Sequence, residues 1–460
     1  MTERKWLNSI WIVALVGYFV VGVGYLLWSY LLTDGNLILT QWSVYWQWQL
    51  SMWQLARELP QIVNQGYLTL VVILYLLYFL IIRFVPDFSV TLRSPKLLFK
   101  LVGIWSVIIL PLIFAYNAHS HDLFNYIFNA RMVVEYQANP HEQVALDFAF
   151  DPWTRFMHNT HTPAPYFYGW TGLSLIPYVL GFGKFLTTWL AFKVFAYMSL
   201  VLLFFVLIWV AQCLSLPLKL KNLSILFFNP LLLMEILGNA HNDIWMMVLA
   251  IISIGLLLGK RITKLTVFLS LVILLLSASI KYSTLIFLPI WMGVLFVTNW
   301  NIAVTWLKKY HLFDLLERFF GQFLISLTYL FKLSLPMFGV LLMFLPLLTE
   351  RSRYFLPWYL TWSLSWLPLL MIVKPAIRPQ GVDRVIKLFV KLGRVLVSWL
   401  IAFSLSSALR YLPWLAAREY SDKINAEERL ITWIGGISIF VLIELINSRK
   451  GRVQPDTINS

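Results

Sequence analysis

Long apolar stretches cover most of the chain, and short polar segments separate them. Because a hydrocarbon core about 30 Å thick needs roughly 20 apolar residues in a helix, each stretch predicts a membrane-spanning helix. The pattern predicts spans at residues 6–32, 67–85, 99–117, 186–211, 223–238, 243–259, 264–280, 283–298, 333–349, 354–373, 389–409 and 430–447. We therefore expect an all-α polytopic membrane protein with about twelve transmembrane helices, forming a single transmembrane domain over residues 1–460.

Three segments do not fit a simple alternation of spans and loops. Residues 170–183 ("WTGLSLIPYVLGFG") are apolar but short and contain Pro177, so we expect a re-entrant or interfacial helix. Residues 299–332 mix charged and apolar positions, which predicts an amphipathic helix on the inner surface or merely a connecting helix. Residues 33–66 are polar but rich in tryptophan, which favours the headgroup layer and predicts an interfacial helix on the outer side.

Composition and charge support lipid as the solvent. The chain is 60% hydrophobic and 12% charged, whereas a soluble domain carries about 25% charged residues. The net charge of +15 first suggests nucleic acid, but with the N-terminus inside most of the 36 Lys and Arg residues fall in inner loops. We therefore expect cytoplasmic termini in a cell membrane, contacts with anionic lipid, and no nucleic-acid partner.

With this orientation, polar residues gather on the outer side of the membrane. The longest polar insertion follows the third span and contains five of the seven histidines. We call residues 118–170 the outer loop. Three further features project to the same side, namely "GNAHND" (238–243), Lys281, and "TERSRYFLPWY" (349–359). Ionisable groups at membrane depth are costly, so their convergence predicts an extracytoplasmic functional site.

Each of these features also has a purely structural explanation. Asp122 can cap the helix that follows it, and Asn242 or Asp243 can cap the next. Arg351 and Arg353 can extend to lipid headgroups. The convergence favours a site, because capping does not require one common side.

The residue types indicate a particular chemistry. A carboxylate beside the membrane can act as a general base on a sugar hydroxyl. Arg and Lys can bind a phosphate leaving group and stabilise its growing charge, and aromatic rings can stack on sugars. Together these groups describe glycosyl transfer from a lipid-phosphate donor.

Five motifs stand in order over roughly residues 115–365. They are "HDLFNYIFNARMVVEYQANPH" (121–141), "TPAPYFYGW" (162–170), "FNPLLLMEILGNAHNDIWMMVL" (228–249), "SASIKYSTLIFLP" (277–289) and "FLPWYLTW" (355–362). The set resembles fold-C (GT-C) integral membrane glycosyltransferases, in particular polyprenol-phosphate-mannose-dependent α-mannosyltransferases. His141 stands where that family has the Tyr of "NPY", and the family's "PYGPL" order is disturbed in the second motif. The sugar, mannose or another hexose, therefore stays open, as does the acceptor.

The resemblance implies an inverting transfer of a sugar from a polyprenyl-phosphate donor to a glycan or glycolipid acceptor on the outer face. It implies Asp122 as the general base that deprotonates the acceptor hydroxyl. It also implies Lys281, Arg351 and Arg353 as candidates for the donor phosphate. The remaining substrate-binding candidates are His121, Tyr126, Tyr166, His241, Asn242, Asp243, Trp358 and Tyr359.

We expect no cofactor and assign no metal ligands. His119, His121 and Asp122 can ligate zinc or manganese together only in an extended stretch, since residues at i and i+2 of a helix do not share a face. The single cysteine, Cys213, excludes an intramolecular disulfide and a cysteine-based metal site. Dependence on a divalent metal stays open.

Two other functions remain as alternatives. The first is a transporter or flippase of lipid-linked sugars, which usually has inverted repeats and broken helices near the membrane midplane. The second is another outer-face lipid enzyme, such as a glycan polymerase or an acyltransferase. The sequence contains no apparent repeat and its polar residues cluster on one face, which favours the glycosyltransferase.

Overall fold

The structure is a computed structural model that describes residues 9–33, 37, 39–259, 262–297, 313–349, 356–370, 383–417 and 421–453, with the backbone alone at 313–327 and 449–453. Across these residues the chain is helical and forms no β-strand. One isolated bridge pairs Ser89 with Lys219. The predicted all-α fold class is confirmed.

The first half of the chain contains α1 (Ser9–Ser29), α2 (Ser43–Glu58), α3 (Pro60–Phe84), α4 (Pro95–Ile113), α5 (Asp122–Tyr136), α6 (Tyr168–Val179) and α7 (Phe185–Cys213). The second half contains α8 (Leu220–Phe227), α9 (Pro230–Leu233), the π-helical turn η5 (Met234–Gly238), α10 (Asp243–Leu257), α11 (Lys264–Ala278), α13 (Phe313–Phe344), α14 (Leu360–Leu364), α15 (Leu367–Leu370), α16 (Asp383–Leu409), α17 (Leu412–Ala417), α18 (Asp422–Leu430) and α19 (Gly436–Val453). Single 3₁₀ turns occupy Tyr30–Leu32, Ala145–Phe148, Thr154–Phe156, Tyr282–Phe287, Leu345–Leu348 and Pro357–Tyr359, and a second π turn occupies Ile431–Gly435.

Local sequence signals begin several of these helices. Pro60 and Pro95 stand at the start of α3 and α4, where the missing N–H of proline costs no helical hydrogen bond. Thr263 caps α11 by accepting the Thr266 N–H at 3.1 Å. Proline and threonine residues outside the apolar runs therefore set where these helices begin.

Within the described residues, seven helices are long and apolar enough to cross a membrane. They are Ser9–Leu32, Pro60–Phe84, Pro95–Ile113, Phe185–Cys213, Thr328–Leu348, Asp383–Ala417 and Asp422–Ser448. Leu220–Phe227 and Pro230–Gly238 form an eighth span if the pair, bent by 55°, counts as one. The chain is thus a membrane protein.

The predicted count of twelve spans is not confirmed. Three predicted spans form shorter apolar helices, Asp243–Leu257, Lys264–Ala278 and Tyr282–Val297. The predicted span 354–373 lies partly outside the described residues, and its described part forms short helical pieces. Of the predicted amphipathic segment 299–332, residues 299–312 also lie outside the described residues, and the rest belongs to α13.

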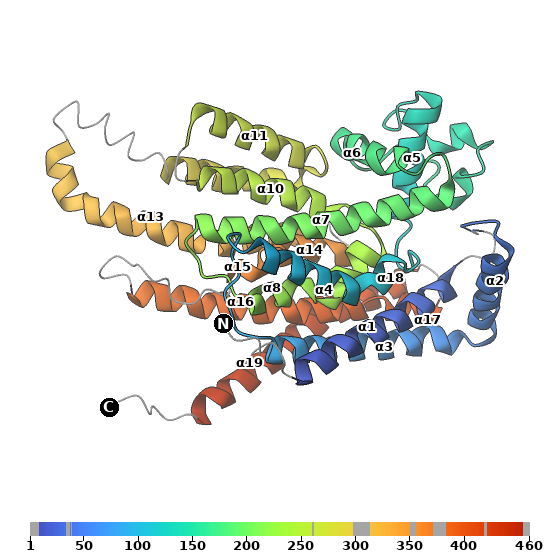
Figure 1. Cartoon of the computed structure of the whole chain (residues 1–460), viewed down its shortest axis with the longest axis horizontal. Coiled ribbons are helices and arrows are strands. Elements are labelled where there is room, and N and C mark those ends of the chain that lie inside the picture. Colours follow the sequence, from blue (N-terminus) through green and yellow to red (C-terminus); the bar gives the residue numbers. More distant parts are fainter. Residues whose placement is uncertain are drawn as a thin grey trace.

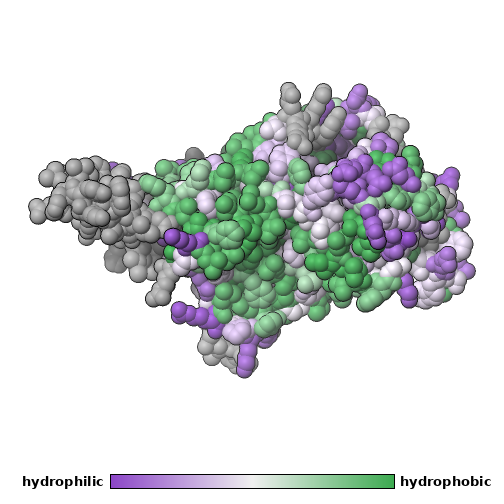
Figure 2. Space-filling model, turned by 90° about the horizontal axis from the view of Figure 1, so that it is seen from above, coloured by the Kyte–Doolittle hydropathy of each residue, from purple (hydrophilic) through white to green (hydrophobic). Residues whose placement is uncertain are grey.

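The long helices run side by side, and α2, α5 and α6 gather at one end of the molecule, on the right in Figure 1. Figure 2 shows an apolar band across the middle and hydrophilic residues over that same end. Apolar side chains such as Val13, Leu76 and Leu442 are 57–69% exposed on α1, α3 and α19. Exposed apolar surface of this extent is costly in water and suits contact with lipid.

Candidate active site

Asp122 begins α5 directly after the turn 117–121, which other parts of the chain hold in place. The Asn117 side chain donates to the Asn239 carbonyl at 2.7 Å and accepts from the Trp189 indole at 2.9 Å. The His119 backbone N–H donates to the Asn239 side chain at 3.2 Å. These bonds fix the end of α4 and the start of α5 against the turn that contains His241.

Three side chains surround the Asp122 carboxylate. Tyr166 donates its hydroxyl to Oδ2 at 2.6 Å, and Tyr126, one helical turn along α5, donates to the same oxygen at 3.4 Å. His241 Nδ1 lies 3.5 Å from Oδ2. The carboxylate is 20% exposed, so it is mostly shielded but still accessible to a substrate.

Tyr166 reaches Asp122 because the segment before α6 packs directly on the end of α11. The Gly169 N–H donates to the Ser279 carbonyl at 2.9 Å, and the Phe167 N–H donates to the Ile280 carbonyl at 3.4 Å. A Cβ atom at Gly169 would lie 2.7 Å from the Ser279 carbonyl oxygen, closer than real Cβ contacts. Glycine at 169 therefore permits the approach that brings Tyr166 beside Lys281.

His241 is placed by a break in the helix that precedes it. Asn229 caps α9 by accepting the Leu232 N–H at 3.2 Å, and the π turn η5 then carries the chain back, so that the His241 N–H donates to the Glu235 carbonyl at 3.2 Å. Ala240 adopts a left-handed conformation with φ of 58°, which costs about 1–2 kcal/mol for a residue with a Cβ. The imidazole is fully buried and stacks on Trp358 at 4.1 Å.

A second group of side chains lies next to this one. Lys281 Nζ donates to Asp243 Oδ1 at 2.7 Å, and the Trp362 indole donates to the same oxygen. The ammonium also lies over the Tyr166 ring, 4.8 Å from its centroid, and 5.7 Å from the centroid of Tyr359. Tyr166 therefore contacts both the Asp122 carboxylate and the Lys281 cation.

Burial and nearby charges shift the pKa values of Asp122 and His241 in opposite directions. Burial raises the pKa of Asp122, although the Tyr166 hydrogen bond and the charge of Lys281 oppose the rise. Burial, followed by the charge of Lys281, lowers the pKa of His241 well below its usual value. A carboxylate with a raised pKa beside a neutral imidazole suits proton transfer near neutral pH.

The structural alternatives of helix capping do not account for these residues. His121, not Asp122, precedes α5 as its cap residue and makes no side-chain capping bond, while the Asp122 carboxylate accepts from tyrosines. Asn242 caps α10 without a side-chain bond, and both of its side-chain polar atoms are buried without a partner among the described residues. An unsatisfied buried polar group costs about 1–3 kcal/mol, which is reasonable where a substrate supplies the missing bonds.

Some predicted residues do not join this cluster. The His121 ring stacks on His158 at 3.6 Å and packs on Phe124 at 5.4 Å, and burial lowers its pKa to about 3. Arg351 and Arg353 lie outside the described residues. The structure brings together the other predicted residues, which are Asp122, Tyr126, Tyr166, His241, Asn242, Asp243, Lys281, Trp358 and Tyr359.

Sequence reasoning missed two buried ionisable groups near the site. Glu235 Oε2 lies 3.5 Å from His241 Nε2, on the side of the ring opposite Asp122. Lys193 Nζ donates to three carbonyls, at Ala115, Leu237 and Gly238, and so ties α7 to α4 and η5. The signal was a single charged residue inside an apolar run, which is rare without a function or a partner.

No metal site emerges from the described residues, where no group of three or more His, Cys, Asp or Glu is arranged to hold an ion. His119 stacks on Tyr411 at 4.1 Å and on Trp28 at 5.5 Å, while His121 stacks on His158. The two rings therefore contact different aromatic neighbours.

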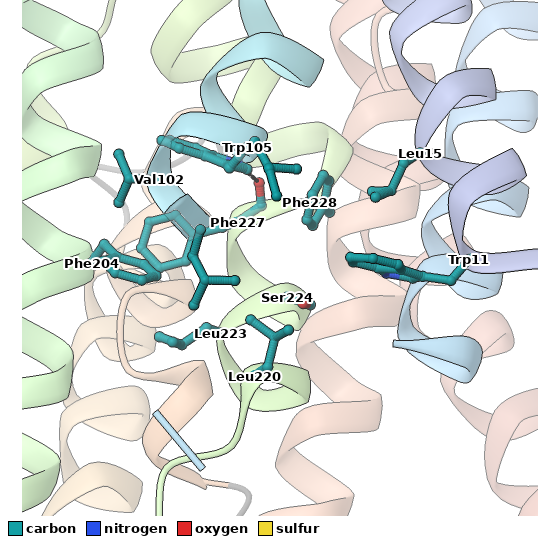
Figure 3. A pocket seen from close by; sticks show the side chains of 12 residues that line it. Trp11, Leu15, Val102, Trp105, Phe204, Leu220, Leu223, Ser224, Phe227 and Phe228 are labelled. Carbon is teal, nitrogen blue, oxygen red and sulfur yellow. Dashed lines mark hydrogen bonds between the residues drawn. The ribbon is translucent and has the colours of Figure 1, made fainter. Parts of the chain in front are cut away.

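A separate pocket lies among α1, α4, α7 and α8 (Figure 3). Its walls are apolar and include Trp11, Leu15, Trp105, Phe204 and Phe228, and the indole of Trp105 is satisfied by the Phe227 carbonyl at 2.7 Å. Among the described residues, no ionisable side chain lines it. The pocket supplies no group for proton transfer or phosphate binding, so the Asp122 cluster is the candidate active site.

Comparison with known proteins identifies the family of the chain. Residues 11–298 match the MptA_B family, described as the N-terminal domain of alpha-(1->6)-mannopyranosyltransferases. Searches of curated proteins and of solved structures found no match. The matched region contains Asp122, Tyr166, His241 and Lys281 and covers well over half of the chain. The chain therefore belongs to this family and is a GT-C-like membrane mannosyltransferase.

Proposed function

We propose that this membrane mannosyltransferase moves mannose from a polyprenyl-phosphate mannose donor to a hydroxyl of a glycan or glycolipid acceptor, with inversion at the anomeric carbon. The linkage in the family description supports the 6-hydroxyl of a mannose as the acceptor group. Inversion that produces an α-linkage requires a β-linked donor.

The proposed reaction needs one base and one cation. The acceptor oxygen attacks the anomeric carbon while its proton passes to the Asp122 carboxylate. The bond from that carbon to the phosphate oxygen breaks, and its electron pair leaves with the lipid phosphate. No general acid is required, because the phosphate departs as an anion that Lys281 can stabilise.

The observation that carries this proposal is the setting of the Asp122 carboxylate. Among the described residues, its hydrogen-bond and ion-pair contacts fall on Oδ2, from Tyr166, Tyr126 and His241. This leaves Oδ1 for the acceptor hydroxyl. The Lys281 ammonium lies over the face of the Tyr166 ring, 4.8 Å from its centroid, where a departing phosphate would complete its contacts.

Other predicted roles belong to the same proposal. Asn242, with its unsatisfied amide, and Asp243 would bind sugar hydroxyls, while Trp358 and Tyr359 would line the site with aromatic surface. Arg351 and Arg353 remain candidates for further phosphate contacts.

The proposed orientation places the active site on the extracytoplasmic side of a cell membrane and both termini in the cytoplasm. Two observations support it. The positive charges of the sequence favour this topology. The described ends of the chain, where α1 starts and α19 finishes, lie away from the end that carries α2, α5 and α6 (Figure 1).

The test is a transfer assay with purified protein in liposomes that contain polyprenyl-phosphate [¹⁴C]mannose and a mannoside acceptor. Asp122→Asn should abolish product formation, whereas the matched control Glu142→Gln, an exposed acid in the same outer loop, should retain it. Label that crosses the bilayer without forming a glycosidic bond would instead support the flippase alternative. Normal transfer by Asp122→Asn would refute the proposed base.

A further inference from the structure

Asp122, His241 and Glu235 form a row through the centre of the site. His241 Nδ1 lies 3.5 Å from Asp122 Oδ2, and His241 Nε2 lies 3.5 Å from Glu235 Oε2. Each distance is longer than an optimal hydrogen bond, and neither nitrogen makes a hydrogen bond with the described residues in this structure. Catalytic hydrogen bonds are often long before the substrate binds and shorten afterwards.

Glu235 is held in place at both of its oxygens. Its side chain is fully buried, Tyr411 donates to Oε1 at 2.7 Å, and Asn239 donates to Oε2 at 3.0 Å. Among the described residues, no Lys or Arg lies within ion-pair distance of this carboxyl. No cation among these residues therefore compensates a charge on Glu235 directly, and an uncompensated buried charge there would be costly.

The number of hydrogens needed at the two contacts of the imidazole determines the protonation state of Glu235. Each contact between a ring nitrogen and a carboxyl oxygen needs one hydrogen, because two lone pairs facing each other repel. Asp122 must be ionised to act as a base, so the hydrogen between it and the ring belongs to Nδ1. A neutral ring then has only a lone pair at Nε2, and the hydrogen on that side must come from Glu235.

We propose that Glu235 is a positioning residue that acts through His241. As a carboxylic acid it donates its hydrogen to Nε2 of the imidazole and fixes the tautomer in which the Nδ1–H faces Asp122. The Trp358 ring, stacked on the imidazole at 4.1 Å, keeps the plane of the ring in line with both carboxyls. Asp122 is thereby held with Oδ1 directed toward the acceptor.

This inference rests on the proposed role of Asp122 and predicts different results for two substitutions. In Glu235→Gln an amide N–H replaces the acid O–H toward Nε2, but the same NH2 group cannot accept the Asn239 N–H, so kcat should fall by less than about fivefold. In Glu235→Leu the ring loses its partner, and kcat should fall about tenfold to a hundredfold, as for other outer-shell hydrogen-bond partners. The KM for the polyprenyl-phosphate mannose donor should stay within about twofold in both, because neither variant changes a group that contacts the donor.

A double-mutant cycle separates this role from a general structural one. In a His241→Gln background, adding Glu235→Leu should lower kcat by less than about twofold, because Glu235 acts only through the imidazole. Effects that multiply would contradict the inference. A folded Glu235→Gln variant with at least a tenfold loss of kcat would also contradict it. If Glu235→Leu is not recovered as a folded protein, the result for Glu235→Gln alone decides the test.

The same assays separate failure of the inference from failure of the proposed function. If Asp122→Asn is inactive while Glu235→Leu matches the wild type, only the role of Glu235 is wrong. If Asp122→Asn is active, the proposed base is wrong, and the role of Glu235 fails with it.

Discussion

Asp122 and Asp151 belong to the same outer loop, and the fold surrounds them with different partners. The Asp151 side chain is fully buried and contacts Arg131 Nε. It also accepts the Tyr136 hydroxyl at 2.6 Å and the Trp153 N–H at 2.9 Å. Burial works against its ionised form, but the hydrogen bonds from Tyr136 and Arg131 prevail and hold its pKa below the usual value.

Asp122 is partly exposed and has no cation at bonding distance among the described residues. Its partners are two tyrosines and the neutral His241, and burial prevails to raise its pKa. By contrast, the cation beside Asp151 has further contacts of its own. Arg131 donates to the Tyr178 hydroxyl at 3.1 Å and lies over the Trp153 ring. A carboxylate with complete partners stabilises a fold, and one with incomplete partners is available for chemistry.

The largest expected difference is in catalysis. Asp122→Asn should lower kcat by at least about a hundredfold, the scale of general base catalysis. Asp151→Asn should leave kcat per folded molecule within about threefold, because it lies outside the reacting groups. Rates corrected for the folded fraction measure both, and equal losses would remove the distinction between the two acids.

The loss of stability should follow the opposite order and be larger on the Asp151 side, as a comparison of Arg131→Met with Asp122→Asn should show. Removing Arg131 in Arg131→Met leaves Asp151 as an uncompensated buried charge and should cost about 3 kcal/mol or more. Asp122→Asn should cost little, since burial already disfavours its charge. Thermal unfolding in detergent measures both, and a larger loss in Asp122→Asn would contradict our account.

The effect on donor binding should be intermediate. Lys281→Met should weaken binding of the lipid-phosphate donor by at least about tenfold, because a charge-assisted bond to phosphate contributes about 1.5–3 kcal/mol. The control is Lys219→Met, which breaks an exposed ion pair with Asp87 and should leave binding unchanged. Equal donor affinity in the wild type and Lys281→Met would exclude this lysine from the phosphate site.

The smallest effect should appear in the pH dependence. Because Asp122 acts in its ionised form and its pKa is raised above 3.8, activity should fall as the pH drops through that raised value. Tyr166→Phe removes a hydrogen bond that lowers this pKa, so the acid limb of the pH–rate profile should move to higher pH. An acid limb that stays in place, or moves to lower pH, would exclude the Tyr166 bond as a determinant of this pKa.

Much of this arrangement could be predicted from the sequence. Apolar runs predict helices well, and the charge pattern predicts Asp122, the 241–243 turn and Lys281 on one side of the membrane. Local polar motifs between apolar runs identify groups that meet, because the ends of antiparallel spans on one side of a membrane lie near each other.

The rest depended on three-dimensional detail. Averaged hydropathy hides a single charge, so Glu235 and Lys193 were not singled out inside their apolar runs. Hydropathy does not detect the 55° bend between α8 and α9, which Asn229 and Pro230 introduce, and this is one reason why the span count differs. The approach of Gly169 to Ser279 joins segments more than a hundred residues apart, which a single sequence does not specify.

The central claim is that Asp122 accelerates the chemical step and does not merely bind substrate. Single-turnover kinetics with donor bound beforehand and acceptor added in excess test it most directly. Our account predicts that Asp122→Asn binds polyprenyl-phosphate mannose as tightly as the wild type but forms the glycosidic bond at least about a hundredfold more slowly. Bond formation at the wild-type rate, or a loss confined to donor binding, would contradict it.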